Sequence, residues 1–255
     1  MTQALRLLSY NIRYGGTGRE AAIADVIRHA GPDIVMLQEA TDPGVVSRIA
    51  ALCEMPHWAS ERNHSTAYVS RIPVRSHQWL LARAARHPFL EVVLEDEEDG
   101  SERCRIYGLH LTAWFSRWSE NTRAREIRAL LDGIREHQAG FHLIAGDFNA
   151  LAPGERLEVA RMPAWIRAMI WVSGRDIARQ TIQTMLDAGY VDGFKQLHGD
   201  DLGYTFPTWD PHVRLDYVFV PGRDVERVRV SRVVEEASAV REASDHFPLF
   251  VEVVG

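Results

Sequence analysis

Short apolar runs recur along the whole chain, and polar or turn residues bound each of them. They read LRLLSYNI, DIVMLQEA, STAYVSRIPV, LEVVLE, RIYGLHLTA, FHLIAGDFNA, RLDYVFVP and FPLFVEVV. Runs of this length, bounded by Gly, Pro or Asp, are typical of strands rather than helices. The sequence therefore predicts a protein built around β-sheets.

Helical patterns lie between several of these runs. The apolar spacing predicts helices over Arg19–Ala30, which Gly31 and Pro32 end, over Asn121–His137, and over Asp176–Ala188. In the second helix we expect most arginines on the solvent side. Because strands outnumber helices and tight turns mix with helical crossovers, we predict an α/β fold with two sheets packed face to face and helices outside.

The size and composition fit one domain over residues 1–255. The chain has 255 residues, of which 46% are hydrophobic, and no stretch approaches a membrane span. The start, MTQALRLLSYN, enters a strand-like run at once, and Cys53 and Cys104 are expected to be free thiols, so a cytoplasmic location is expected. The net charge of −6 argues against a broad basic surface that coats nucleic acid.

Polar residues stand at the ends of the predicted strands. They are Asn11, Glu39, His110, Asp147, Asn149, Asp216, Asp245 and His246. Each alone has an ordinary explanation as a turn, a cap or a hydrogen-bonded core histidine. Because buried carboxylates and imidazoles are costly without partners, their repeated placement predicts one shared polar crevice at an edge of the sheets.

These residue types indicate a particular chemistry. Carboxylate and amide oxygens without cysteine clusters suit Mg²⁺ or Mn²⁺, which neutralises charge on a phosphoryl oxygen and on a departing alkoxide. A histidine held by an aspartate can accept a proton from water. The motif G-x-S-x-G and a Gly-rich loop ending in Gly-Lys-Ser/Thr are both absent. The sequence therefore predicts a metal-dependent hydrolase of phosphate esters.

The order of the motifs also carries a resemblance. LLSYNIRYGG, PDIVMLQEA, SRIPV, LHLTA, LIAGDFNA, RLDYVFV and SDHFPLFVEV, between residues 7 and 252, resemble the motif series of the endonuclease/exonuclease/phosphatase superfamily. The resemblance implies a four-layer sandwich with two central, mixed, mostly antiparallel sheets. It also implies the chemistry of deoxyribonuclease-like or sphingomyelinase-like phosphohydrolases.

The resemblance implies a metal-binding group. Glu39 is similar to the principal metal-binding carboxylate of the family, and Asn11 beside it to a residue that binds metal or phosphate. Asp245 resembles a second carboxylate of the metal shell. Asp147 matches an aspartate that serves either a second metal or activation of the nucleophile.

The resemblance also implies catalytic roles. His246 looks like the histidine that activates water, with Asp216 as its orienting partner. Asn149 would hold a non-bridging phosphate oxygen. His110 matches the histidine that stabilises the phosphate or protonates the leaving group in the deoxyribonuclease and sphingomyelinase branches. Where many relatives have a Gly-Asn pair or an acidic residue, this chain reads NHST at residues 63–66, so the partner of His110 is not predicted, and His64 is either that partner or an ordinary loop residue.

Three segments are candidates for substrate contact. Residues 151–188 are expected to form a helical insert beside the active-site mouth; the apolar residues of 161–175, among them Trp165 and Trp171, form either a lid or an interfacial helix, or pack on the sandwich. Trp114, Phe115 and Trp118 could stack on a base, hold an acyl chain or anchor a loop. In GYTFPTWDPHVR, which resembles the family loop beside the reaction centre, the candidates are Thr205, Trp209, His212 and Arg214.

The leading functional hypothesis is a phosphodiesterase in which Mg²⁺ or Mn²⁺ and water activated by His246 achieve in-line attack on phosphorus. We rank a small or lipid-like phosphodiester, with a membrane lipid surface as a possible partner, slightly ahead of DNA or RNA cleavage. The alternative of another class is a catalytically inactive binding module. No protein partner is implied.

Overall fold

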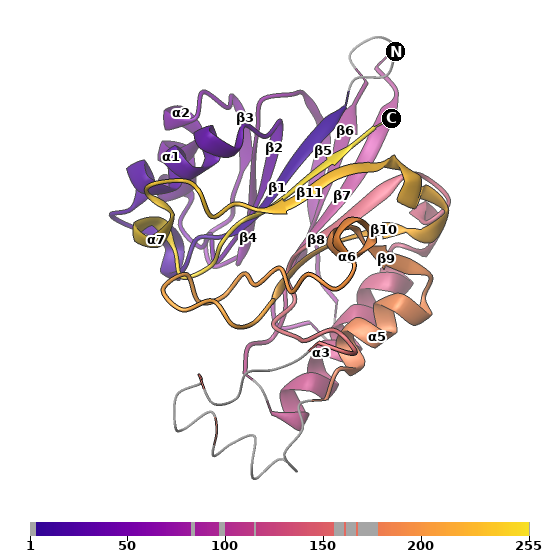
Figure 1. Ribbon diagram of the computed structural model, residues 1–255. Coiled ribbons are helices and arrows are strands. Elements are labelled where there is room, and N and C mark those ends of the chain that lie inside the picture. Colours follow the sequence, from indigo (N-terminus) through magenta and orange to yellow (C-terminus); the bar gives the residue numbers. More distant parts are fainter. Residues whose placement is uncertain are drawn as a thin grey trace.

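A computed structural model describes residues 4–82, 85–96, 100–114, 116–155, 161, 167 and 178–254. Its strands form two six-stranded sheets (Figure 1). The first sheet has the order β11-β12-β1-β2-β4-β3, with β1 Leu5–Asn11, β2 Ile34–Gln38, β3 His57–Ala59, β4 Thr66–Ser70, β11 Val228–Val233 and β12 Leu249–Val253. The second has the order β5-β6-β7-β8-β10-β9, with β5 Val74–Leu80, β6 Phe89–Glu95, β7 Glu102–His110, β8 His142–Asp147, β9 Tyr190–Asp192 and β10 Asp216–Pro221.

Each sheet is antiparallel except for one pair of strands. The parallel pair is β1 with β2 in the first sheet and β7 with β8 in the second. Both sheets are therefore mixed and mostly antiparallel, as predicted. Joining parallel neighbours requires a crossover, and helices supply it: α1 lies between β1 and β2, and α3 between β7 and β8.

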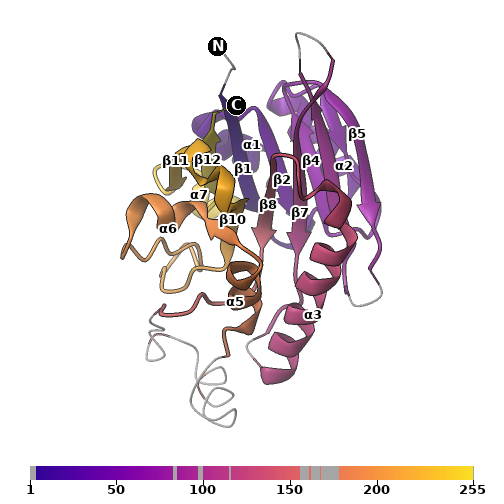
Figure 2. The ribbon, with the colours of Figure 1, turned by 90° about the vertical axis from the view of Figure 1, so that its right-hand side faces the viewer.

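The helices lie outside the two sheets (Figure 2), except α6, whose Phe194 packs into the layer between them. They are α1 Glu20–Ala30, α2 Pro43–Leu52, α3 Arg117–Gly133, α5 Gln180–Asp187, α6 Gly193–His198 and α7 Val240–Ala243, with short 3₁₀ turns at η1 Tyr14–Gly16, η2 Arg135–His137 and η4 Gly222–Arg227. The helices α1, α2 and α7 cover the first sheet, whereas α3 and α5 cover the second. This arrangement is the predicted four-layer sandwich.

Strands with two apolar faces hold these layers together. In β1, Leu8 and Tyr10 face the helices, whereas Leu5 and Leu7 face the other sheet. In an antiparallel sheet with one face in solvent, apolar and polar residues alternate along each strand. Here both faces of the strands are buried, so nearly every position requires an apolar residue. The continuous apolar runs of the sequence follow from this requirement.

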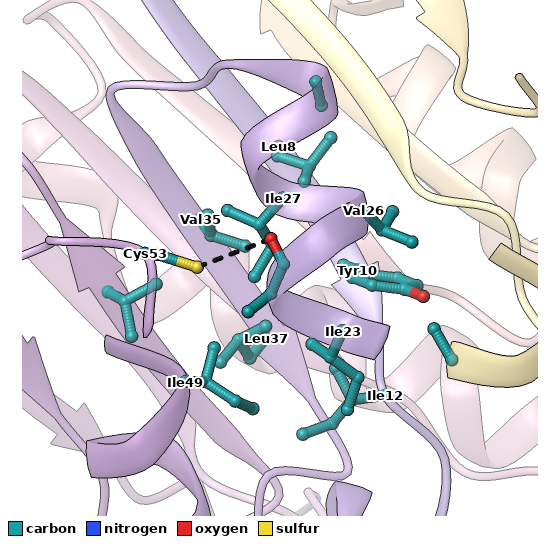
Figure 3. Close-up of a cluster of buried hydrophobic side chains, with 14 of the residues drawn as sticks. Leu8, Tyr10, Ile12, Ile23, Val26, Ile27, Val35, Leu37, Ile49 and Cys53 are labelled. Atoms are coloured by element: carbon teal, nitrogen blue, oxygen red, sulfur yellow. Dashed lines mark hydrogen bonds between the residues drawn. The ribbon is translucent and has the colours of Figure 1, made fainter. Parts of the chain in front are cut away.

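The layer between α1 and the first sheet shows the packing in detail (Figure 3). Ile23, Val26 and Ile27 of α1 lie against Leu8 and Tyr10 of β1, and all are fully buried. Burying a side chain of this size stabilises the fold by about 1.5–3 kcal/mol. Nearby, the free thiol of Cys53 donates to the carbonyl of Ala24 at 3.8 Å. Cys104 is also free and buried, as expected.

Every predicted strand is present, but some elements were not predicted. The edge strand β5 is mostly exposed and polar, so its sequence lacks an apolar run. The helix α2 was not predicted, although Asp42 as N-cap and Pro43 in the first turn are typical of a helix start. The helix α3 begins at Arg117, with Ser116 as its N-cap, earlier than predicted. No helix in the described ranges is long and apolar enough to cross a bilayer.

Candidate active site

Strand register brings three of the predicted residues side by side. Asp147 at the end of β8 pairs with His110 of the parallel strand β7 and with Asp216 of the antiparallel strand β10. Asn11 ends β1 in the other sheet, and its side-chain amide donates to Asp147 Oδ2 at 3.0 Å. The two sheets therefore meet at one polar centre around Asp147.

His246 is held by Asp216. Its Nδ1 lies 2.9 Å from Asp216 Oδ2, and its Nε2 lies 3.9 Å from Asp147 Oδ2. Burial alone would lower the pKa of His246, but the charges of Asp216, Asp147 and Asp245 and the hydrogen bond to Asp216 outweigh it and raise the pKa to about 10. The imidazole is thus oriented by one carboxylate and directed at another.

Asp147 is buried and accepts hydrogen bonds from neutral donors. The backbone N–H of Asn149 donates to Oδ1 at 2.8 Å, and the side-chain amides of Asn11 and Asn149 donate to Oδ2. Burial raises the pKa of Asp147 to about 7; His246 opposes this shift, and the charge of Asp216 adds to it. The Asn149 amide also donates to the carbonyl of Leu111, so in this structure it orients Asp147.

Glu39 joins this centre through Asn11. The Asn11 amide donates to Glu39 Oε1 at 3.3 Å as well as to Asp147, and the backbone N–H of Tyr14 donates to Glu39 Oε2 at 2.5 Å. Glu39 has a φ of +57°, an uncommon conformation for a residue with a Cβ. Such backbone strain is typical of positions whose direction matters for a site.

His110 has a partner that the sequence did not reveal. Its Nδ1 lies 2.5 Å from the hydroxyl of Ser65, and its Nε2 lies 3.8 Å from Asp147 Oδ2. Burial lowers the pKa of His110 to about 3, and His87, His246 and Arg86 add to the effect. His64, the alternative partner, lies instead beside Glu61 and Trp79.

Asp245 lies at the edge of the cluster. Its Oδ2 is 3.4 Å from Nε of Arg13, and its backbone carbonyl accepts from the N–H of Thr208. The preceding Ser244 donates to the carbonyl of Asn11 at 2.7 Å. The segment before β12 is thereby fixed to the end of β1, and Arg13 is a charged neighbour that the sequence had not suggested.

The donor set fits a divalent cation. Among the described residues, ligand atoms of Asp147, Asp216 and His246 lie within 4.8 Å of one another. Asp147 forms no ion pair with a described Lys or Arg, and a buried carboxylate without such a partner is the kind of group that a cation neutralises. Carboxylate and amide oxygens are ligands that Mg²⁺ and Mn²⁺ accept.

Two predicted substrate contacts, Arg214 and Thr205, are buried and have partners within the chain. Arg214 is fully buried, forms ion pairs with Glu155 and Asp192, and lies over the ring of Tyr217. Thr205 is also fully buried, and its hydroxyl accepts from the N–H of Leu215 at 3.0 Å. An Arg followed by an apolar run gave no sign that its partners would be two distant carboxylates.

His212 is also buried, with its Nδ1 beside the carbonyl of Asp210. Trp209 and Trp114 are different, because 61% and 56% of their surfaces are exposed. Trp209 contacts Phe206, whose ring centroid lies 4.9 Å from that of His246. Tyr14, next to Glu39 in space, is 81% exposed and was not predicted.

The insert largely falls outside the described residues. Of its apolar segment 161–175, only Arg161 and Arg167 are described, and Phe115 is also outside. Arg161 pairs with Asp210, which is adjacent to Trp209. The last predicted helix is described as α5, Gln180–Asp187, and Trp118 is exposed in the first turn of α3.

The two-sheet sandwich has a buried carboxylate, an aspartate-bound histidine and amide groups at its strand ends, which is the arrangement expected of a phosphoester hydrolase. The chain belongs to the endonuclease/exonuclease/phosphatase family, whose model matches residues 8–246. It is accordingly a divalent-metal-dependent phosphoric ester hydrolase. No curated protein matches the sequence.

Solved structures share the fold at low sequence identity. The 3′ phosphatase NExo from Neisseria, bound to a product DNA hairpin, has a TM-score of 0.73 and 17% identity, covering 98% of this chain and 100% of that one. TDP2 from D. rerio, complexed with single strand DNA product, has a TM-score of 0.68 and 18% identity, covering 98% of each chain. An AP endonuclease from Archaeoglobus fulgidus has a TM-score of 0.70 and 16% identity, covering 97% of this chain and 98% of that one.

Proposed function

We propose that the chain is a Mg²⁺- or Mn²⁺-dependent phosphodiesterase that acts on nucleic acid. The observation that carries this proposal is the direction of His246: Asp216 holds one ring nitrogen at 2.9 Å, and the other faces the buried Asp147 at 3.9 Å. This arrangement suits a histidine that accepts a proton from water.

The proposed substrate differs from the ranking that the sequence suggested. An apolar cleft for a lipid-like substrate depended on residues 161–175, of which only two are described. The described residues around the site instead expose Tyr14, Trp114 and Trp209, and exposed aromatic rings stack on bases. Neighbours of similar fold are described with product DNA, which supports the same choice.

The roles of the residues follow from their contacts. Nε2 of His246 accepts a proton as the water oxygen attacks phosphorus and the bond from phosphorus to the leaving oxygen breaks. His110 is kept neutral, and Ser65 can donate to its Nδ1, which leaves Nε2–H as a donor toward a phosphate oxygen. Asn149 keeps Asp147 in place through its backbone and side-chain amides.

Glu39, Asn11, Asp245 and Asp147 are the residues that we assign to the cation. When bound, it supplies positive charge that stabilises a phosphoryl oxygen and the departing alkoxide. Asp216 is the main cause of the raised pKa of His246, and Asp147 and Asp245 add to it, so neutralising these last two carboxylates lowers that pKa and favours the neutral imidazole that acts as a base.

The test is a substrate panel with Mn²⁺ that compares single-stranded DNA, RNA, sphingomyelin and bis-p-nitrophenyl phosphate. We expect metal-dependent cleavage of nucleic acid, and a loss of at least about 100-fold in kcat for His246→Gln. The exposed His29→Gln serves as the matched control and should keep full activity. Cleavage of sphingomyelin but not of nucleic acid would overturn the substrate assignment, and full turnover by His246→Gln would overturn the catalytic one.

A further inference from the structure

A second imidazole stacks on His110. The ring of His87, in the segment before β6, lies parallel to that of His110, with centroids 5.3 Å apart and planes 3° apart. His87 is half-buried, and neither of its ring nitrogens hydrogen-bonds to a described residue. Because no described residue occupies these nitrogens, a bound molecule can reach them.

A cation stands next to this ring. Arg86 is exposed, and its guanidinium forms no ion pair within the described ranges. Burial lowers the pKa of His87, and the charge of Arg86 is the next cause; the same charge also contributes to the low pKa of His110. The positive group therefore lies near both imidazoles.

A buried carboxylate fixes the segment that carries these two residues. Glu126 of α3 accepts from the backbone N–H of Arg86 at 2.9 Å, from the N–H of Thr112 at 3.1 Å and from the hydroxyl of Thr112 at 2.9 Å. Thr112 follows His110 by two residues, so one side chain fastens both histidine segments. Burying a charge costs more than burying an apolar residue, which argues that Glu126 serves this placement.

The neighbouring turn of α3 fixes the loop after His110. Arg123 is fully buried, pairs with Glu120 and donates to the carbonyls of Thr112 and Trp114 at 2.8 and 2.7 Å. Glu120 also accepts from the N–H of Thr181 at the start of α5. The buried charged face of α3 thus holds the loops on both sides of the stacked rings.

We propose that Arg86 and His87 form a subsite for a second phosphate group, adjacent to the scissile one, and that Glu126 is its positioning residue. The subsite rests on the proposed action on nucleic acid. His110 faces Asp147 with its Nε2, and His87 is stacked against the plane of the same ring, one ring further from the centre. A cation and an unpaired imidazole at this distance suit the neighbouring phosphate of a nucleic-acid strand, whose backbone such proteins follow with positive groups.

The experiment uses Mn²⁺ and starts from a dinucleoside monophosphate, which has only the scissile phosphate. It compares this substrate with two forms of it that carry one added terminal phosphate, at one end or at the other. For the wild type we expect kcat/KM to be higher for one of the phosphorylated forms. Arg86→Ala and His87→Ala should each lower the ratio of kcat/KM between that form and the unphosphorylated substrate by about 5- to 30-fold, through KM; any effect that reaches the reaction through His110 falls on both substrates and cancels in this ratio.

The positioning role is tested with Glu126→Gln. The decrease in kcat/KM caused by Glu126→Gln should depend on the added phosphate in the same way, and the double variant with His87→Ala should show little further decrease. Arg128→Ala, which removes an exposed charge from the same helix, is the control and should leave the ratio between the substrates unchanged.

The outcomes separate the two proposals. Equal losses on both substrates, or no loss in Arg86→Ala and His87→Ala, would overturn the subsite while leaving the phosphodiesterase in place. Turnover of neither dinucleotide by the wild type would overturn the proposed function together with its subsite. An equal loss on both substrates for Glu126→Gln alone would show a structural role for that residue only.

Discussion

Asp147→Asn should stabilise the protein in the absence of metal while abolishing its activity. The pKa of Asp147 rises from 3.8 to about 7 on folding, because burial disfavours the charged carboxylate and the charge of Asp216 adds to this effect, whereas His246 and the amide donors of Asn149 and Asn11 oppose it only in part. A group that binds its proton more tightly in the folded state weakens that state as pH rises from about 4 through about 7. The full cost above pH 7 is about 4 kcal/mol.

The asparagine does not recover all of this energy. Asn11 and Asn149 both donate to Asp147 Oδ2, and an amide NH₂ at that position would face two donors. A lost buried hydrogen bond costs about 1–3 kcal/mol, so the net gain at pH 8 is roughly 1–3 kcal/mol. Below pH 4 the gain disappears, because Asp147 is then protonated in both states.

Denaturant unfolding in chelator at pH 4 to 8 measures this difference. Added Mg²⁺ should then stabilise the wild type and have little effect on the variant, because a ligand stabilises only a state that binds it. Asp132→Asn on the surface of α3 is the control and should change stability by less than about 1 kcal/mol at every pH. The reasoning fails if wild type and Asp147→Asn have parallel pH profiles, or if the variant is the less stable protein at pH 8.

Three further predictions concern other parts of the site. Asp216→Asn should lower kcat by about 100- to 10,000-fold with an unchanged circular dichroism spectrum, because His246 loses the carboxylate that orients it; near-normal turnover would contradict this. The folded pKa of His110 is about 3, below its ordinary 6.5, so His110 alone should contribute a loss of about 2 kcal/mol of stability between pH 7 and pH 5; the difference between the unfolding titrations of the wild type and His110→Asn measures this contribution. Arg214→Met should lower the free energy of unfolding, measured with denaturant, by about 3–5 kcal/mol, because it leaves two buried carboxylates unpaired. A raised KM with unchanged stability would instead indicate that Arg214 contacts the substrate.

Much of the fold could be predicted because its strands are apolar on both faces. A run such as HLIAG is apolar at successive positions, so it is stable only where both faces of the strand are covered by other layers. The polar residue that follows each run then lies at the edge of the sheet, where the strands end. The convergence of Asp147, Asp216 and His246 follows from this pattern together with the resemblance. Strand β5 could not be found in the same way, because an edge strand with exposed side chains does not need an apolar run.

Partners across the sheets could not be predicted. Ser65 immediately precedes β4 in one sheet, and its hydroxyl hydrogen-bonds to His110 at the end of β7 in the other sheet. Nothing in the sequence around Ser65 indicates this contact between the sheets. The buried arginines are a related case. The prediction that most arginines of this helix lie toward solvent is confirmed, but the pattern did not indicate the exception, Arg123 of α3, which is fully buried against Glu120.

These buried charges divide the site into two parts with different origins. The carboxylates and amides at the strand ends are fixed by sheet register, so an equivalent set is expected wherever this register recurs. The loops that carry His87 and Trp114 are held by Glu126 and Arg123 through hydrogen bonds to their backbone groups. A loop held in this way can change by substitution of one helix residue without disturbing either sheet, because its fixing bonds lie outside the sheet layers. Substrate preference in this protein is therefore expected to depend on α3 and the loops it fixes, while the reaction depends on the sheets.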